Sequence, residues 1–193
     1  MAAPERIIVG GGLVLRRWRP ADAEALSRAI DESLEHLRPW MPWAAPASLE
    51  ERRAILASWE REWDMGGDLV YGLLLGPLVV GSFGLHRRIG PGGLEIGYWV
   101  HAAHTRRGYA SAAVATLTSM AFTLPGIAVV EIHHDRANLA SEGVPRTLGF
   151  TLVGEHSASS SSPPPAESGI YRAWRMTRDR WRPPVASLPP AGA

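Results

Sequence analysis

The chain has 193 residues, 46% of them hydrophobic, and a formal net charge of +1 at pH 7. This length suits one domain with a single core, and charges of both signs, interspersed along the chain, predict neither a nucleic-acid interface nor a membrane-binding surface. The sequence contains no cysteine and no lysine, which excludes disulfides, thiolate metal sites, a cysteine-borne acyl-enzyme and the Walker phosphate loop with its obligatory Lys.

Taken in chain order, hydrophobic periodicity and turn residues predict strands and helices throughout residues 13–177, which form the single expected domain. The expected elements are strand 13–18, helix 19–30, helix 48–63, strands 69–75, 78–86 and 94–100, helix 108–122, strand 127–133, helix 138–148, and strands 150–153 and 170–176. The segments expected to be flexible are the glycine-ending lead-in 1–12, the Ser- and Pro-rich loop 157–165 and the Pro/Ala-rich tail 182–193.

Local signals support several of these boundaries. Ser48 and Glu51 match the capping box that opens a helix, Gly76 and Pro77 mark a tight turn between two strands, and Gly149 ends the last helix. The central strands follow one another through short connections, which favours an antiparallel meander over a doubly wound parallel sheet. The expected fold is α/β of the α+β type, with a mixed, mostly antiparallel sheet of about seven strands flanked by about four helices.

The turn between strand 94–100 and helix 108–122 carries the strongest chemical signal. It contains Arg106 and Arg107, and the first turn of the helix has no acidic residue. Unpaired backbone N–H groups and the macrodipole make a helix N-terminus attractive to anions, and Gly108 allows the backbone to approach a ligand closely. The segment therefore predicts a phosphate-binding loop.

Residues 105–110, Thr-Arg-Arg-Gly-Tyr-Ala, resemble the acyl-CoA pyrophosphate loop of the GNAT superfamily of N-acetyltransferases, which reads Gln/Arg-x-x-Gly-x-Gly/Ala. Thr105 departs from this pattern and removes one side chain that could reach phosphate. Asn138 and Ser141, followed by Leu-Gly-Phe at residues 148–150, resemble the second signature of that superfamily. The predicted order of strands and helices is also that of the GNAT fold, so the resemblance covers nearly the whole domain.

The resemblance implies acetyl-CoA as the co-substrate and no metal. In the superfamily, the strand before the loop splays from its neighbour, its backbone pairs with the pantetheine arm, and a backbone N–H polarises the thioester carbonyl. Gly97 in this strand fits a bulge or a close backbone approach. Asn138 also suits a helix N-cap. The implied cofactor-binding residues are Tyr98, Trp99 and Val100 on the strand, Thr105, Arg106, Arg107, Gly108, Tyr109, Ala110 and Ser111 on the loop, and Asn138.

Acetyl transfer needs a neutral amine and a proton for the departing thiolate. By resemblance, Glu95 is the candidate general base, directly or through water, with a structural carboxylate as the alternative, and Glu155 is the second candidate. Ser141 or a tyrosine would protonate the thiolate. An α-amine with a pKa near ~7.8 is roughly a tenth neutral at pH 7, and a Lys amine near ~10.4 is below about 0.1% neutral. A weak base would therefore favour an α-amine acceptor.

Other side chains are candidates for the acceptor site or for metal binding. His36, Trp40 and Met41 could form the acceptor-site wall, with core packing as the alternative for Trp40 and Met41. His101 and His104 have a spacing found in metal sites. No third ligand is evident beside them in the sequence, so no metal is predicted.

Segments 13–20, 37–43 and 95–110 resemble the branch of the superfamily typified by ribosomal-protein alanine and serine acetyltransferases. The leading prediction is acetyl-CoA-dependent transfer of an acetyl group to the α-amine of a protein or peptide N-terminus. The first alternative is transfer to a small amine, such as an aminoglycoside, a polyamine or an amino acid. The second is a non-catalytic acyl-CoA-binding module, which Thr105 and Ala112 leave open because related helices often carry an acidic residue at the latter position.

The expected partners are acetyl-CoA and the amine acceptor, and a homodimer is compatible with the resemblance. No apolar run approaches the roughly 20 residues of a membrane span, and the first residues do not resemble a secretory signal. The expected location is therefore the cytoplasm, with no nucleic-acid or membrane partner.

Overall fold

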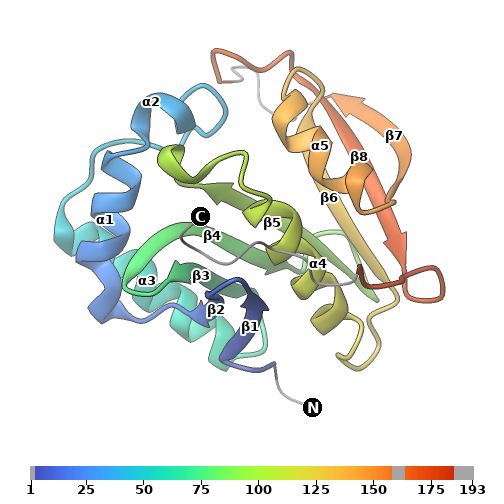
Figure 1. Cartoon of the computed structure of the whole chain (residues 1–193), viewed down its shortest axis with the longest axis horizontal. Helices are drawn as coiled ribbons and strands as arrows, with labels where there is room; N and C mark the ends of the chain where they lie inside the picture. Colours follow the sequence, from blue (N-terminus) through green and yellow to red (C-terminus); the bar gives the residue numbers. More distant parts are fainter. Residues whose placement is uncertain (1–2, 158–163, 185–193) are drawn as a thin grey trace.

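The computed structural model describes residues 3–157 and 164–184. Most of the expected loop 157–165 and tail 182–193 therefore lies outside the described residues. Eight strands form one sheet, in the order β1-β2-β3-β4-β5-β6-β8-β7 (Figure 1). They are β1 (Arg6–Gly10), β2 (Leu13–Arg17), β3 (Leu69–Leu75), β4 (Leu78–His86), β5 (Gly93–Val100), β6 (Val129–Asp135), β7 (Thr151–Ser157) and β8 (Ile170–Thr177). All neighbouring strands run antiparallel except β5 and β6, which confirms the expected mixed, mostly antiparallel sheet.

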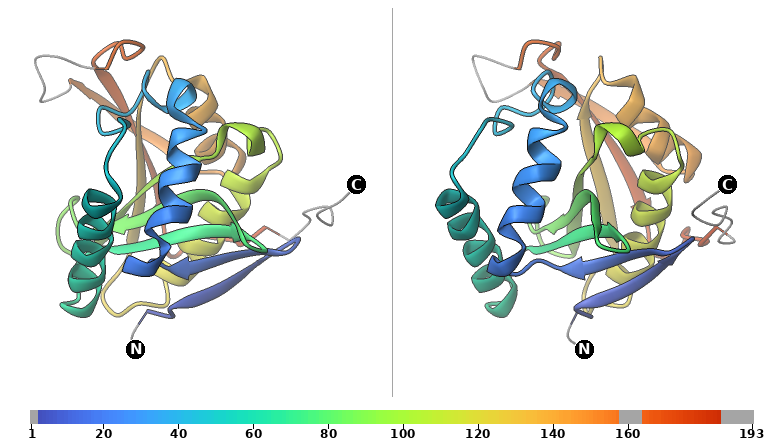
Figure 2. Two further views of the ribbon diagram at one scale, coloured as in Figure 1. Left: turned by 90° about the vertical axis from the view of Figure 1, so that its left-hand side faces the viewer. Right: turned by 60° about the vertical axis from the view of Figure 1, so that its left-hand side comes forward.

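Helices cover both faces of the sheet. They are α1 (Ala23–Asp31), α2 (Leu34–Leu37), α3 (Leu49–Asp64), α4 (Tyr109–Ala121) and α5 (Leu139–Thr147), with short 3₁₀ helices at Pro20–Asp22 and Ala102–His104. Figure 2 shows α1 and α3 on one face of the sheet and α4 on the other. No helix within the described ranges has both the length and the apolar character that a membrane span requires.

The alternation of side chains along the strands divides the core into two layers. On β4, Phe83 and Leu85 are fully buried in the larger layer, which lies beneath α4. Ser82 and His86 lie on the opposite face, where Ser82 accepts a hydrogen bond from the indole N–H of Trp18, a member of the layer beneath α1 and α3. This second face of β4 therefore carries small and polar groups and leaves room for a site.

The sheet has one strand that was expected to be part of a flexible lead-in. Residues 6–10 form β1 and pair with β2, with Ile7 opposite Leu15. The three glycines at 10–12 have φ values of 110°, 57° and 80°, so they form the tight turn of a hairpin. The run Arg-Ile-Ile-Val is too short to reveal this strand by alternation alone, because a glycine triplet also fits a flexible segment.

Other boundaries also differ from the prediction: the expected strand 127–133 is β6 at Val129–Asp135, and the expected helix 19–30 is a 3₁₀ turn followed by α1. The connector 34–43 contains the single helical turn α2, and β7 continues to Ser157 because its pairing with β8 runs that far. The capping box is confirmed. The hydroxyl of Ser48 accepts the backbone N–H of Glu51 at 3.2 Å, and the Glu51 carboxylate accepts the backbone N–H of Ser48 at 2.7 Å.

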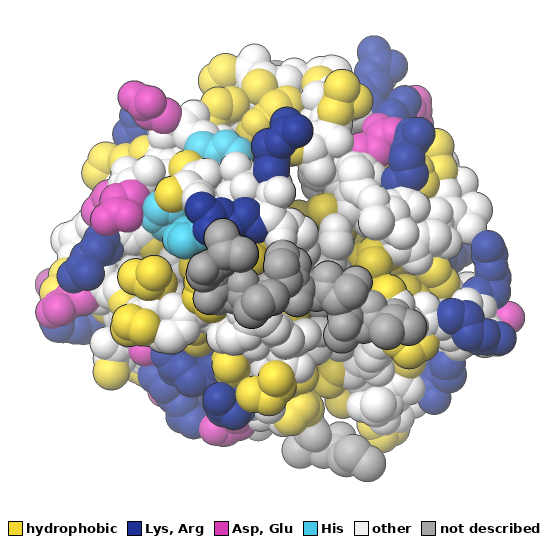
Figure 3. Space-filling model, viewed as in Figure 1, with side chains coloured by type: hydrophobic (Ala, Val, Ile, Leu, Met, Phe, Trp, Pro, Cys, Tyr) yellow, Lys and Arg dark blue, Asp and Glu magenta, His cyan; other side chains and the backbone are white. Residues whose placement is uncertain are grey.

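The surface carries charges of both signs side by side. On the face seen in Figure 3, arginine side chains lie among aspartate and glutamate side chains. Ion pairs of the described residues include Arg16 with Asp22 at 2.8 Å and Arg19 with Glu60 at 2.8 Å. This mixture agrees with the formal net charge of +1.

The two parallel strands at the centre of the sheet separate part-way along their length. β5 and β6 pair only from Gly93, opposite Val129, to Glu95, opposite Glu131. Beyond this point β5 pairs with β4 alone and β6 with β8 alone. The expected splay of the strand before the loop is therefore present, and one edge of β5 is open toward the gap.

Candidate active site

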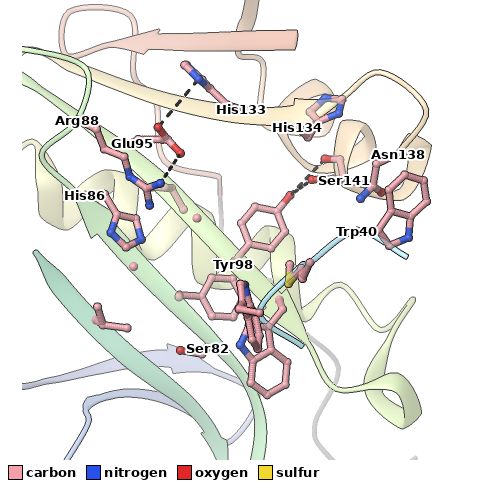
Figure 4. A pocket seen from close by; sticks show the side chains of 18 of the residues that line it. Trp40, Ser82, His86, Arg88, Glu95, Tyr98, His133, His134, Asn138 and Ser141 are labelled. Atoms are coloured by element: carbon pink, nitrogen blue, oxygen red, sulfur yellow. Dashed lines mark hydrogen bonds and ion pairs between the residues drawn. The ribbon is translucent and has the colours of Figure 1, made fainter. Parts of the chain in front are cut away.

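A cavity of about 520 Å³ lies where β5 and β6 diverge. Its walls come from α1, the connector 38–48, α3, β4, β5, β6, α5 and the start of β8. Figure 4 shows side chains of β4 and β5 on one side and those of β6 and α5 on the other. The volume falls within the range of small-molecule sites, which combine apolar walls with a few placed polar groups.

Tyr98 and Ser141 bridge the gap between β5 and α5. The Tyr98 hydroxyl lies 3.1 Å from Oγ of Ser141 and donates to the Ser141 carbonyl oxygen at 3.2 Å (Figure 4). Phe83 stacks on the tyrosine ring with centroids 5.4 Å apart. Burial raises the pKa of Tyr98 to about 12, and the hydrogen bond with Ser141 partly opposes this shift. The phenol therefore keeps its proton at neutral pH.

Asn138 fixes the start of α5, the helix that carries Ser141. Its side-chain oxygen accepts the backbone N–H of Ser141 at 3.0 Å, which confirms the N-cap alternative. Both residues line the cavity. The cap uses only the oxygen of the amide, so it leaves the side-chain NH₂ group available to a ligand.

Glu95 lies on β5 at the point where the pairing with β6 stops. Its side chain is 15% exposed, and its carboxylate oxygens lie 3.9 Å from Nη1 of Arg88 and 4.0 Å from Nδ1 of His133 (Figure 4). These distances exceed those of hydrogen bonds. Glu131, opposite Glu95 on β6, contacts Nε2 of His133 at 2.6 Å and holds the ring in place. The Glu95 carboxylate therefore lies near the side chains of Arg88 and His133 without a hydrogen bond to either, and it remains accessible to a ligand in the cavity.

His86 faces Glu95 from the neighbouring strand and lines the same cavity. Its Nδ1 lies 2.6 Å from Oδ2 of Asp68. Its Nε2 lies over two glycines: a Cβ atom would stand 2.4 Å from Nε2 at Gly84 and 3.3 Å from it at Gly97. Gly97 is thus a site of close approach rather than a bulge, since the β4–β5 register is continuous there.

The Asp68 carboxylate sets the tautomer of His86. Although burial favours the neutral acid, hydrogen bonds from His86 and from the backbone N–H of Arg87 lower the pKa of Asp68. An ionised carboxylate at Nδ1 requires the ring to donate from that nitrogen, so the neutral imidazole accepts at Nε2. Sequence reasoning missed this pair because its members lie far apart in the chain. The available signal was the predicted hairpin 69–75 and 78–86, whose pairing brings residues 68 and 86 together.

The remaining candidates separate into two groups. Trp40 and Met41 line the cavity, as expected for the acceptor wall. His36 is exposed on α2 and lies outside the lining. Glu155 also lies outside the lining, on β7, where its carboxylate accepts from Nε of Arg172 at 2.9 Å. The structure therefore brings Glu95, and not Glu155, to the cavity.

The expected phosphate loop has the backbone geometry of a helix N-terminus. Gly108 is the N-cap of α4 with φ +76°, and Arg106 has φ +60°, a conformation that non-glycine residues rarely adopt. The first backbone N–H to bond within the helix is that of Ala112, which donates to the Gly108 carbonyl at 3.0 Å. The amides of residues 109–111 precede it and have no helical acceptor. The Thr105 hydroxyl donates to the Ala102 carbonyl at 3.1 Å and so holds the turn.

The histidines near this loop make other contacts. His101 lies 3.0 Å from a carboxylate oxygen of Glu32. Burial lowers the pKa of His104, and the nearby His101 and Arg107 lower it further. Among the residues that the structure describes, no three His, Cys, Asp or Glu side chains are arranged to hold a metal ion.

The family model of the acetyltransferase (GNAT) domain matches residues 12–151. A Bacillus subtilis (strain 168) protein named "Putative ribosomal N-acetyltransferase YdaF" is 30% identical over a match 152 residues long, and the match covers 74% of this chain and 80% of the relative. RimL, a ribosomal L7/L12 alpha-N-protein acetyltransferase solved with coenzyme A, has a TM-score of 0.81 at 21% identity and covers 90% of this chain and 98% of its own. MccE, a microcin C7 self immunity acetyltransferase solved with acetyl-CoA and AMP, has a TM-score of 0.81 at 18% identity, with 90% and 97% covered.

Proposed function

The chain belongs to the GNAT family of acetyltransferases and is an acyltransferase, and we propose that it transfers the acetyl group of acetyl-CoA to the α-amine of a protein or peptide N-terminus. The observation that carries the proposal is the splay between β5 and β6, bridged by Tyr98 and Ser141 and open to one cavity. A thioester held along the free edge of β5 would meet an amine that enters from the face of β4 and β5.

The residues present fit acetyl-CoA as the co-substrate. Past Glu95, the open edge of β5 offers the backbone groups of residues 98–100 to a pantetheine arm. The first-turn amides of α4, with Gly108 and the adjacent Arg106 and Arg107, suit the pyrophosphate. The side-chain NH₂ group of Asn138 could donate a hydrogen bond to the pantetheine arm. Acetyl-CoA supplies the activated acyl group, and the chain supplies its binding and orientation.

The amine must lose a proton as its nitrogen attacks the thioester carbon. We assign this proton to Glu95, directly or through a water molecule, because its carboxylate lies in the cavity and can attract the ammonium form of the acceptor. His86, opposite Glu95 on β4, offers Nε2 as a second acceptor that passes the proton on. The demand on either base is modest for an α-amine, which is roughly a tenth neutral at pH 7.

The C–S bond breaks as the amide forms, and the thiolate of CoA then takes a proton. Ser141 is the donor in this proposal, Tyr98 replaces its proton through the contact between their hydroxyls, and the Tyr98 phenolate then takes a proton from water that enters the cavity. Since the pKa of Tyr98 is raised to about 12, the phenol is protonated at the start of each turnover.

The ribosomal relatives favour a protein N-terminus as the acceptor, and a ribosomal-protein substrate would place the reaction in the cytoplasm. Thiol release from acetyl-CoA tests this with a Ser- or Ala-initiated peptide and with the same peptide blocked at its N-terminus. The chain has no cysteine, so the protein adds no thiol to the signal. Release with the free peptide alone supports the proposal. Release only with small amines would move the function to that alternative, and acetyl-CoA binding without any turnover would indicate a non-catalytic module.

A further inference from the structure

Arg52 is a buried cation in the wall of the cavity. It lies on α3, its residue is only 4% exposed, and it belongs to the cavity lining. One guanidinium nitrogen donates to the carbonyl of Ala45 at 2.8 Å. Its Nε is buried and has no hydrogen-bond partner among the described residues.

No carboxylate of the described residues forms an ion pair with Arg52. The residues outside that description, at 1–2, 158–163 and 185–193, contain no aspartate and no glutamate. Glu51, the preceding residue, is exposed and its carboxylate is held by Ser48, so Arg52 helps to lower the pKa of Glu51 but forms no ion pair with it. Burying a charge without an ionic partner is unfavourable, and an anion that entered the cavity would relieve this cost.

Arg17 shows how the same fold treats a buried arginine with a structural role. It is 5% exposed, and it pairs with Glu5 at 3.0 Å and Asp64 at 2.7 Å. A third contact goes to the carbonyl of Glu60 at 2.9 Å. The two arginines are almost equally buried, yet only Arg17 has carboxylate partners. Since Nε of Arg17 also has no hydrogen-bond partner among the described residues, it is the carboxylate partners, together with the place of Arg52 in the cavity wall, that distinguish the two side chains.

Charged side chains of both signs line the cavity, and among them Arg88 already lies 3.9 Å from Glu95. Arg52 comes from α3, which packs on β3, whereas Glu95 lies on β5 and Asp135 on β6. The carboxylate of Asp135 already accepts from the backbone N–H groups of Ala137 and Gly169 at 2.8 and 2.9 Å. A ligand that contacts both β5 and α3 would therefore meet the Glu95 carboxylate on one element and the guanidinium of Arg52, which has no carboxylate partner, on the other.

We infer that Arg52 binds a carboxylate of the acceptor, so that the preferred acceptor carries both a primary amine and a carboxylate. This inference rests on the proposed transfer to an amine. The carboxylate comes either from an acidic side chain close to the peptide N-terminus or from the free α-carboxylate of a short peptide. A polycationic acceptor would place positive charge beside the unpaired guanidinium and is disfavoured.

Peptide pairs of equal shape test the inference. Thiol release is measured with the amides Ser-Glu-Ala and Ser-Gln-Ala, and with Ser-Ala as the free acid and as the amide. We expect the acid of at least one pair to have a kcat/KM about tenfold or more above its neutral partner, the usual size for a charged hydrogen bond. The pair that shows the preference identifies the source of the carboxylate. Equal rates within both pairs would overturn the inference.

The variants Arg52→Gln and Arg53→Gln assign the effect to one side chain. Arg53 is the next residue on α3 and is exposed, so it is a matched control for charge and helix position. Arg52→Gln should abolish the preference for the acid, measured as the ratio of kcat/KM for acid and neutral peptide, and Arg53→Gln should keep that ratio. An unchanged preference in Arg52→Gln would contradict the assignment.

A binding measurement separates this inference from the proposed function. Titration calorimetry measures the affinity of acetylated peptides for the wild-type protein in the presence of CoA. The peptides are N-acetyl-Ser-Glu-Ala amide and N-acetyl-Ser-Gln-Ala amide, and N-acetyl-Ser-Ala as the free acid and as the amide. Tighter binding of an acid, lost in Arg52→Gln, supports the anion site even if no peptide is acetylated. Equal affinities of acid and amide in both pairs would refute the anion site whether or not turnover is seen. The same titration serves if Arg52→Gln fails to fold, because the comparison of acid with amide needs only the wild-type protein.

Discussion

Nδ1 of His86 lies 2.6 Å from Oδ2 of Asp68, and this contact orients an imidazole whose Nε2 lies over Gly97 in the neighbouring strand. If His86 passes on the proton of the amine, Asp68→Asn should lower kcat about ten- to a hundredfold, because an amide no longer requires Nδ1 to carry the hydrogen. Steady-state kinetics of thiol release measures the change. Asp31→Asn, at the exposed end of α1, is the control and should keep the wild-type rate. A normal kcat in Asp68→Asn would remove His86 from the proton path.

The same carboxylate makes the stability of the fold depend on pH. Burial opposes ionisation of Asp68, but hydrogen bonds from His86 and the backbone N–H of Arg87 lower its pKa overall. Such a group stabilises the folded state above its unfolded pKa, near ~3.9, and this contribution is lost as the pH falls through the lower folded value. Urea unfolding at pH steps below about 5 should therefore show a steeper loss of free energy of unfolding for the wild type than for Asp68→Asn. Parallel curves would contradict the assigned shift.

Glu95→Gln tests the proposed base, because its effect should depend on pH. At high pH an α-amine is already largely neutral, so a base contributes most below the amine's pKa. We expect the variant to lose more activity near pH 6 than near pH 9. The control is Glu155→Gln, since Glu155 lies on β7 outside the cavity, and it should follow the wild-type profile. A uniform loss for Glu95→Gln would instead assign the carboxylate to positioning of the acceptor.

Tyr98→Phe and Ser141→Ala test the proposed proton donor to the thiolate. The two hydroxyls lie 3.1 Å apart, so each variant interrupts the same path, and the losses should not add. We expect each single variant to lower kcat about a hundredfold or more, and the double variant to be little worse than the slower single one. The KM for acetyl-CoA should change less than kcat. Additive losses would mean that the two hydroxyls act independently.

Most of the sheet and the loop could be predicted from local patterns. Alternating apolar residues and the Gly76–Pro77 turn were sufficient to predict β3 and β4. Gly108 was sufficient to predict where α4 begins. The hairpin of β1 and β2 could not be recognised, because glycines at 10–12 fit a flexible segment as well as a tight turn. Only the pairing of residues 6–10 with β2 distinguishes the two.

The parts of the site that escaped prediction depend on contacts between distant segments. Glu95 and Ser141 could be predicted as candidates because each lies beside a recognisable motif, and both line the cavity. Asp68 and His86 have no motif, and their contact follows from the register of β3 with β4. The unpaired state of Arg52 is likewise invisible in the sequence, since twenty arginines and nineteen acidic residues allow many pairings. Burial and pairing emerge only when the chain is folded.

Gly108→Val tests the phosphate loop most directly. Gly108 has φ +76° at the N-cap of α4, and a β-branched side chain there is strained and would cover the first-turn amides. We expect acetyl-CoA binding, measured by titration calorimetry, to be abolished. Gly126→Val is the matched control: its φ is +75° and the space around it is open, so it shares the backbone strain but lies in the turn before β6. If Gly108→Val folds normally by circular dichroism and still binds acetyl-CoA with wild-type affinity, the loop is not the pyrophosphate site.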